Sequence, residues 1–105
     1  MESHQFFAKN GPYPLKKIIR AIDPENIICI GVTSFDLINK NNAEGVLKNE
    51  YMDRLYRYFA IGGFGDKPVY LVAHPSKSNR GVPTEKKDDA FDRALKLIES
   101  KWVKR

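Results

Sequence analysis

Two short apolar runs constrain the fold of this chain more than any other feature. They cover residues 27–30 (IICI) and 69–73 (VYLVA). A strand with one face in water alternates apolar and polar residues, whereas an unbroken run is typical of a strand buried on both faces, as in a parallel sheet. Gly31 ends the first run, and His74-Pro75 ends the second. We therefore predict two buried strands that each lead into a loop.

Three other segments carry apolar residues at the spacing of an amphipathic helix. The first begins at Pro14, a residue favoured at the first position of a helix, and the second can be capped by Thr33 or Ser34. The third begins near residues 84–88. The apolar residues are Leu15, Ile18, Ile19 and Ile22 in the first segment, Phe35, Leu37 and Ile38 in the second, and Phe91, Leu95, Ile98 and Trp102 in the third. We predict a helix over each segment.

The stretch between residues 46 and 68 allows two interpretations. Apolar residues at helical spacing are Met52, Leu55, Tyr56 and Phe59. Residues 56–61 fit a short aromatic strand equally well, because aromatic side chains favour strands. Residues 62–68 (GGFGDKP) are typical of a turn or a flexible loop. The sequence alone leaves helix and strand open here.

The order of these elements indicates an α/β fold. Two apolar strands joined through a helical crossover form a right-handed βαβ unit, with parallel strands and helices packed on the sheet. We therefore predict a three-layer α/β domain over residues 13–105, with a short parallel sheet flanked by helices, after a flexible lead-in of residues 1–12. A short sheet leaves apolar edges that a second copy of the chain or a partner chain can cover.

Composition and charge narrow the classes of function. The chain has 105 residues, and 18 Lys and Arg against 13 Asp and Glu give a net charge of +5, which favours phosphate groups or acidic partners. No apolar stretch approaches the roughly 20 residues of a membrane-spanning helix. The single cysteine, Cys29, has no partner at disulfide or metal-ligand spacing, and glycine motifs for nucleotide cofactors are absent. We expect a cytoplasmic protein without a metal or cofactor.

The loops after the two strands form the candidate functional site, because ligands of such folds bind at the carboxyl ends of the strands. In the first loop, Gly31 leads into a helix whose free N–H groups can receive a phosphate, although a tight turn explains the same residues. In the second loop, His74 can donate a hydrogen bond to developing negative charge, or it merely caps the strand end. Side chains that offer donors to anionic oxygens there are Ser76, Lys77, Ser78, Asn79 and Arg80.

Two segments resemble the carboxyl-terminal half of the uracil-DNA glycosylase superfamily. The first is the strand IICIG that leads into VTSFDLI, and the second is the strand VYLVAHPS that leads into KSNRG and a final amphipathic helix. The resemblance covers about residues 15–102. It implies half of the fold of such an enzyme, with DNA as the partner and no cofactor.

The resemblance also implies roles for single residues. His74 matches the catalytic histidine that hydrogen-bonds uracil O2 as negative charge develops on the leaving base, while Pro75 and Ser76 would shape a phosphate-compressing loop. The segment entering the minor groove would comprise Lys77, Ser78, Asn79 and Arg80, and the second phosphate loop Gly31, Thr33 and Ser34. Extruding a base from the stack costs free energy that contacts to the DNA backbone offset, so such loops must be rigid and rich in donors.

Important family features are missing. The motif that positions water, which contains Gly, Asp and Pro, has no counterpart ahead of Leu15, and KSNRG lacks the apolar residue that the family inserts into the base stack. We therefore predict a DNA- or phosphate-binding domain that lacks the water-activating half. The alternative is a non-catalytic structural or protein-interaction domain that retains the fold. Aromatic residues in one span favour it, although core packing is the more common explanation of such residues. These residues are Tyr51, Tyr56, Tyr58, Phe59 and Phe64.

Overall fold

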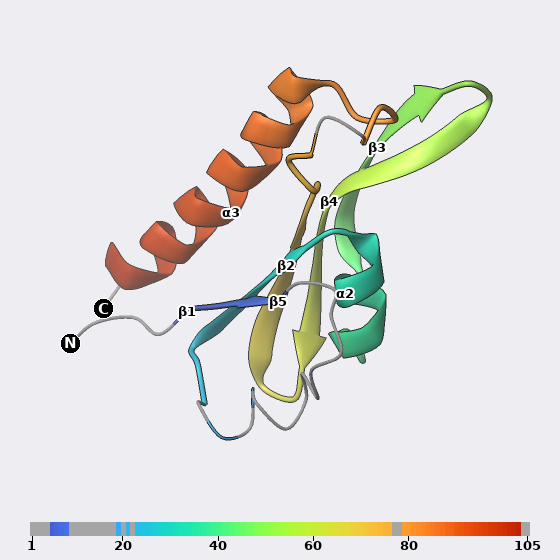
Figure 1. Ribbon diagram of the computed structural model, residues 1–105. Helices are drawn as coiled ribbons and strands as arrows, with labels where there is room; N and C mark the ends of the chain where they lie inside the picture. Colours follow the sequence, from blue (N-terminus) through green and yellow to red (C-terminus); the bar gives the residue numbers. More distant parts are fainter. Residues whose placement is uncertain (1–4, 9–18, 20, 22, 77–78, 104–105) are drawn as a thin grey trace.

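The computed structural model describes residues 5–8, 19, 21, 23–76 and 79–103, and Figure 1 shows their arrangement. One sheet has the strand order β1-β2-β5-β4-β3. The strands are β1 (Gln5–Ala8), β2 (Asn26–Ile30), β3 (Glu44–Tyr51), β4 (Arg54–Phe64) and β5 (Lys67–Val72). Helix α2 (Val32–Ile38) follows β2, and helix α3 (Thr84–Val103) follows β5.

Strands β2 and β5 are neighbours in the sheet and run parallel, which confirms the prediction from the two apolar runs. Ile28 pairs with Tyr70 and Ile30 pairs with Val72, so both strands end at the same edge of the sheet. β5 lies between β2 and β4, and its residue Leu71 is completely buried. The unbroken apolar pattern therefore reflects burial on both faces of the central strands.

The sheet is mixed, which corrects the prediction of a parallel sheet. β4 pairs antiparallel with both β5 and β3. The segment that fitted a helix or a strand equally well is a β-hairpin, and its strands meet at Met52 and Asp53, whose φ angles are 52° and 61°. Positive φ at both central residues is typical of the type I′ turn. Because this turn usually carries Asn and Gly rather than Met and Asp, no turn signal is visible in the sequence.

Residues 62–68, expected to form a turn or a flexible loop, largely belong to the sheet. Gly62 and Gly63 pair with β5, and only residues 65–66 form a turn. A Cβ atom at Gly62 would overlap the side chain of Asn39, so glycine allows the chain that leaves α2 to lie directly on the sheet. The Gly63 N–H donates a hydrogen bond to Asn39 Oδ1 at 2.9 Å. The close approach of the Asn39 and Asn41 side chains, rather than flexibility, explains these two glycines.

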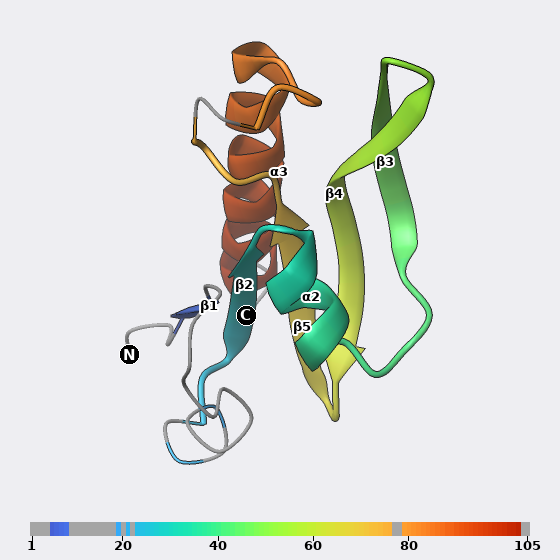
Figure 2. The same ribbon diagram turned by 45° about the vertical axis from the view of Figure 1, so that its right-hand side comes forward.

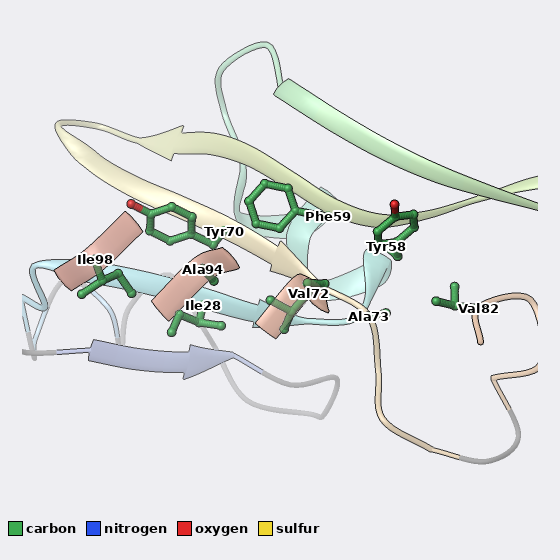
Figure 3. Close-up of a cluster of buried hydrophobic side chains, with 10 residues drawn as sticks. Ile28, Tyr58, Phe59, Tyr70, Val72, Ala73, Val82, Ala94 and Ile98 are labelled. Atoms are coloured by element: carbon green, nitrogen blue, oxygen red, sulfur yellow. The ribbon is translucent and has the colours of Figure 1, made fainter. Parts of the chain in front are cut away.

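Helices cover both faces of the sheet, which confirms the three-layer arrangement (Figure 2). Alternate residues of a strand point to opposite faces, so β2 and β5 contribute to a separate core on each side. On one face, Phe35 and Ile38 of α2 pack with the sheet residues Ile27, Cys29, Ala60, Phe64, Val69 and Leu71. On the other face, Ala90, Ala94 and Ile98 of α3 pack with Ile28, Tyr58, Phe59, Tyr70 and Val72 (Figure 3).

Both predicted helices after the strands are present, but the predicted cap of the first is wrong. Gly31, with a φ of 101°, occupies the N-cap position of α2, no side chain caps the helix, and Thr33 and Ser34 are residues of the helix itself. Only glycine adopts such a φ without strain, which accounts for a glycine at this position. Helix α3 begins at Thr84, as expected. Neither described helix is long and apolar enough to cross a membrane.

The N-terminal segment contains a strand that the sequence did not indicate. β1 lies within residues 1–12, the expected lead-in, and pairs in parallel with β2, with Gln5 opposite Asn26. Four residues are too few to show a periodic pattern, which explains why no element was predicted there. The helix expected from Pro14 onwards falls largely outside the described residues, although Ile19 is completely buried.

Candidate functional site

A pocket of about 620 Å³ lies at the edge where β2 and β5 both end. This volume is within the range of small-ligand sites in proteins. The loop after β2, the loop after β5 and the first half of β4 each contribute to its wall. The lining residues are Ile30, Gly31, Val32, Thr33, Leu55, Tyr56, Arg57, Ala73, His74, Ser76, Asn79 and Val82.

Gly31 joins the two strand-end loops. Its N–H donates a hydrogen bond to the Val72 carbonyl oxygen at 2.9 Å, which extends the pairing of β2 and β5 into the loop. A Cβ atom at Gly31 would lie 4.0 Å from His74 Cβ, so the two loops are in contact at this point. The positive φ of 101° would strain any other residue here. Gly31 is therefore required by the backbone of the site, whatever the pocket binds.

His74 is exposed and its ring is oriented by a local hydrogen bond. The Ser76 backbone N–H donates to Nδ1 of His74 at 3.1 Å. Because Nδ1 is the acceptor, the hydrogen of the neutral ring is on Nε2, which makes Nε2 the ring's donor. Asn79 Nδ2 donates to the His74 carbonyl oxygen at 3.1 Å. The first hydrogen bond thus selects one tautomer of the neutral His74 ring. The second hydrogen bond, from Asn79, holds the backbone of the loop.

Lys87 of α3 is bound to the same loop by a hydrogen bond. Its ammonium group donates to the Ser76 carbonyl oxygen at 2.9 Å, and the residue is only 8% exposed. A buried ammonium group needs such a partner, since an unpaired buried charge is strongly unfavourable. Lys87 therefore places a positive charge behind the His74–Ser76 loop. No role for Lys87 was predicted from the sequence.

Arg57 is the functional residue that sequence reasoning missed. Its guanidinium group donates from Nη1 and Nη2 to the two carboxylate oxygens of Asp36, at 3.1 and 2.8 Å. Two of the five N–H donors of an arginine are used in this way, which leaves three for a ligand. Arg57 reaches the pocket because β4 pairs with β5. No local pattern predicts this position, since it depends on the hairpin.

Tyr56 and Asn49 connect the hairpin to the loop before α3. Asn49 Nδ2 donates to the Gly81 carbonyl oxygen at 2.8 Å. A Cβ atom at Gly81 would overlap the ring of Tyr56, so this ring lies directly on the glycine backbone. The apolar wall of the pocket, formed by Tyr56 and Leu55, is therefore positioned by contact with the second loop.

The structure brings together only part of the predicted site. Gly31, Thr33, His74, Ser76 and Asn79 line one pocket. Ser34 is completely buried within α2, whereas Pro75 and Arg80 are exposed and lie outside the pocket lining. Lys77 and Ser78 lie outside the described residues.

Other catalytic chemistry finds no support within the described ranges. No group of three or more His, Cys, Asp or Glu residues among them could hold a metal ion. Cys29 lies in the core, and burial raises the pKa of its thiol to about 12. A nucleophilic cysteine needs a lowered pKa and access to its substrate, so Cys29 has the properties of a packing residue.

Comparison with known proteins adds no relative to this description. No protein-family model, curated protein or solved structure matches the chain. The resemblance to the uracil-DNA glycosylases therefore stays a prediction from the residues quoted above, and function has to be argued from the geometry of the pocket.

Proposed function

We propose that the pocket at the ends of β2 and β5 binds phosphate groups of DNA. The observation that carries this proposal is the convergence of two strand-end loops and Arg57 on one pocket. Hydrogen bonds to DNA phosphates come mainly from Arg and Lys, from Ser, Thr and Asn side chains, and from backbone N–H groups. Arg57, Thr33, Ser76 and Asn79 supply these side-chain types around the pocket.

The apolar part of the wall favours a nucleotide over free phosphate. Leu55 and Tyr56 line the pocket beside the polar groups, and Tyr56 is partly exposed. Unpaired bases stack on aromatic side chains, and this contact tolerates any base. We therefore propose single-stranded DNA, or a duplex with an unpaired or missing base, as the preferred ligand. His74 would then direct its Nε2 donor at an oxygen of the base.

Binding is tested by fluorescence anisotropy of a labelled single strand and of a duplex that contains an abasic site, over a range of salt. We expect affinity to fall as salt rises, because phosphate contacts release counterions. Inorganic phosphate should compete weakly. Absence of binding at low ionic strength would overturn the proposal.

Substitutions of Arg57 and of its ion-pair partner Asp36 distinguish a role in DNA binding from a purely structural role. Arg57→Gln should weaken binding about tenfold, because it removes charged hydrogen bonds, and should lower the salt slope by about 0.7 on a single strand. Asp36→Asn should tighten binding roughly twofold to fivefold, because Arg57 is released from an exposed ion pair. A merely structural ion pair would make both variants change binding in the same direction.

The Arg93–Asp89 pair of α3 supplies matched controls. It joins the same residue types at 2.7 Å and neither residue lines the pocket. Arg93→Gln and Asp89→Asn should change DNA affinity by less than the variants at Arg57 and Asp36. Equal effects from both pairs would mean that net charge, rather than the pocket, governs binding.

Base excision is tested separately from binding. The assay measures uracil released from a uracil-containing oligonucleotide by the intact chain and by His74→Ala. Release that is lost in His74→Ala would extend the proposed function to catalysis. Binding without release would restrict the domain to recognition.

A non-catalytic interaction domain is the alternative, and most of the aromatic span does not favour it. Tyr58, Phe59 and Phe64 are buried within one chain, so core packing accounts for them. Tyr51 is the exception, with 42% of its surface exposed near the hairpin turn.

A further inference from the structure

We propose that β3 pairs antiparallel with β3 of a second copy of this chain, so that two sheets join across a two-fold axis at Asn49. This inference does not depend on DNA binding. β3 is the last strand in the sheet order, and within the described ranges no strand pairs with its outer side (Figure 2). An uncovered edge strand presents free N–H and C=O groups to another strand.

The hairpin turn determines which backbone groups face outward. Tyr51 and Arg54 close a two-residue turn, and such a closing pair exchanges hydrogen bonds across the hairpin. Hydrogen-bonded and non-hydrogen-bonded pairs alternate along antiparallel strands. Tyr51 and Asn49 therefore use their backbone groups on β4. Lys48 and Glu50 direct theirs away from the sheet, where a further strand would bond.

Charge then selects the register of a second copy. Antiparallel pairing of outward-facing residues could place Lys48 opposite itself, Glu50 opposite itself, or Lys48 opposite Glu50. The first two arrangements place like charges directly opposite, which is unfavourable. The third forms two reciprocal Lys48–Glu50 pairs and places the two-fold axis at Asn49. Only the third register satisfies both the hydrogen bonds and the charges.

Within one chain these two charges are not neutralised. Both side chains are exposed, and neither forms an ion pair with another described residue. The cross-strand neighbour of Lys48 in the hairpin is Arg57, which already pairs with Asp36. A glutamate from a second copy would give Lys48 the ion-pair partner that it lacks among the described residues. In an antiparallel pair of β3 strands, Lys48 of each copy therefore faces Glu50 of the other copy.

The same register also places apolar groups opposite one another. Leu47 of one copy would lie opposite Tyr51 of the second copy on the α3 face of the sheet. The turn residue Met52 would lie beside Val46 on the α2 face, which also carries Lys48 and Glu50. Tyr51 is 42% exposed and Met52 is 78% exposed in the single chain. Pairing would cover part of this apolar surface. Because only one short strand of each copy takes part, we expect an interface smaller than the roughly 1,000 Å² of a stable complex, and therefore a weak dimer.

Sedimentation equilibrium over micromolar to millimolar concentrations measures this association. Lys48→Glu and Glu50→Lys each convert both ion pairs into like-charge pairs and should raise the dimer dissociation constant roughly tenfold or more. An equimolar mixture of the two variants should associate again, because each copy then supplies one sign of charge. The double variant K48E/E50K should also regain the dimer.

Folding and general charge effects are controlled within the same series. Circular dichroism melting should show both single variants folded, since the two side chains are exposed. Glu99→Lys on the exposed surface of α3 changes net charge by the same amount as Glu50→Lys and should leave the dimer intact. A wild-type chain that stays monomeric at millimolar concentration overturns the proposal. So does a dimer that the single variants leave unchanged, or a mixture that fails to associate.

Discussion

The parallel pair β2–β5 and the hairpin β3–β4 belong to one sheet but are stabilised in different ways. In β2, Ile27, Ile28 and Cys29 are completely buried, whereas no residue of β3 is buried. The parallel pair has a helix on each face. The outer part of the hairpin is held by the pairing of β3 with β4 and by the hydrogen bond from Asn49 to Gly81. One sheet thus combines a fully buried centre with an edge strand in which no residue is buried.

The pocket lies where these two regions meet. Its loops belong to the parallel pair, while Tyr56 and Arg57 come from the hairpin. Substitutions in one region only therefore test whether the two regions are stabilised differently.

The largest difference is expected between two leucines. Leu71→Ala should lower the free energy of unfolding by about 2–5 kcal/mol, because it leaves a cavity in the central strand, where the side chain is completely buried. Leu55→Ala, at a position 64% exposed in the hairpin, should change it by at most about 0.5 kcal/mol. Urea denaturation followed by circular dichroism measures both. Similar losses would show that the hairpin is as constrained as the centre.

A smaller effect is expected where the two regions touch. Gly81→Ala should cost about 1–3 kcal/mol, because its Cβ would overlap the ring of Tyr56 and force it to move. Since Tyr56 lines the pocket, DNA binding should weaken as well. The control is Gly65→Ala, which has open space but a φ of 64°, and should cost stability without affecting binding. Thermal melting and anisotropy distinguish the two outcomes.

Cys29 provides a pH-dependent probe of the parallel pair. Burial raises the pKa of its thiol from 9.0 to about 12, so between these values the unfolded chain releases a proton that the native chain retains. The native state therefore binds more protons, and stability falls as pH rises, by at most about 1.4 kcal/mol per pH unit from this group. This contribution is fully present below pH 9 and absent from Cys29→Val, whose side chain does not titrate. A wild-type slope equal to that of Cys29→Val between pH 9 and 12 would contradict it.

The smallest expected effect is a gain of stability in the hairpin. Asp53→Gly should stabilise the chain by about 0.5–1 kcal/mol, because glycine adopts the φ of 61° without steric cost. The same change at Asp66, the second residue of the β4–β5 turn, where φ is not positive, is the control and should give no gain. Urea denaturation would contradict the prediction if the two variants were equally stable.

The sequence predicts those elements whose residues share one environment. The two apolar runs indicated β2 and β5 because both faces of these strands are buried. The apolar stripe predicted for α3 was only partly right, because Ile98 packs on the sheet with Ala90 and Ala94, whereas Phe91 is 37% exposed.

The hairpin escaped prediction because its turn is not marked by Asn or Gly. The helical spacing of its apolar residues does not reflect a buried face, since Met52 and Leu55 are exposed. An irregularity in pairing near Leu47 also breaks the strand pattern, because Tyr58 and Phe59 lie in one core.

The same limit applies to the candidate site. Gly31 and His74 were identified because each directly follows a predicted strand, and the parallel pairing of those strands brings them into contact. Arg57 reaches the pocket only through the pairing of β4 with β5, which no local pattern reveals. Lys87 has no distinguishing neighbours in the sequence and becomes significant only because α3 places it under Ser76.

The bond from Lys87 to Ser76 also links motions of the pocket to those of α3. Lys87 lies in the first turn of the helix, and its ammonium group reaches the loop that holds His74. Fraying of this turn would remove the loop's support, so both segments should open in one cooperative step. Backbone amides near Ser76 and in the first turn of α3 should then exchange hydrogen with solvent at similar rates, and a bound ligand should slow exchange in the helix as well as in the loop.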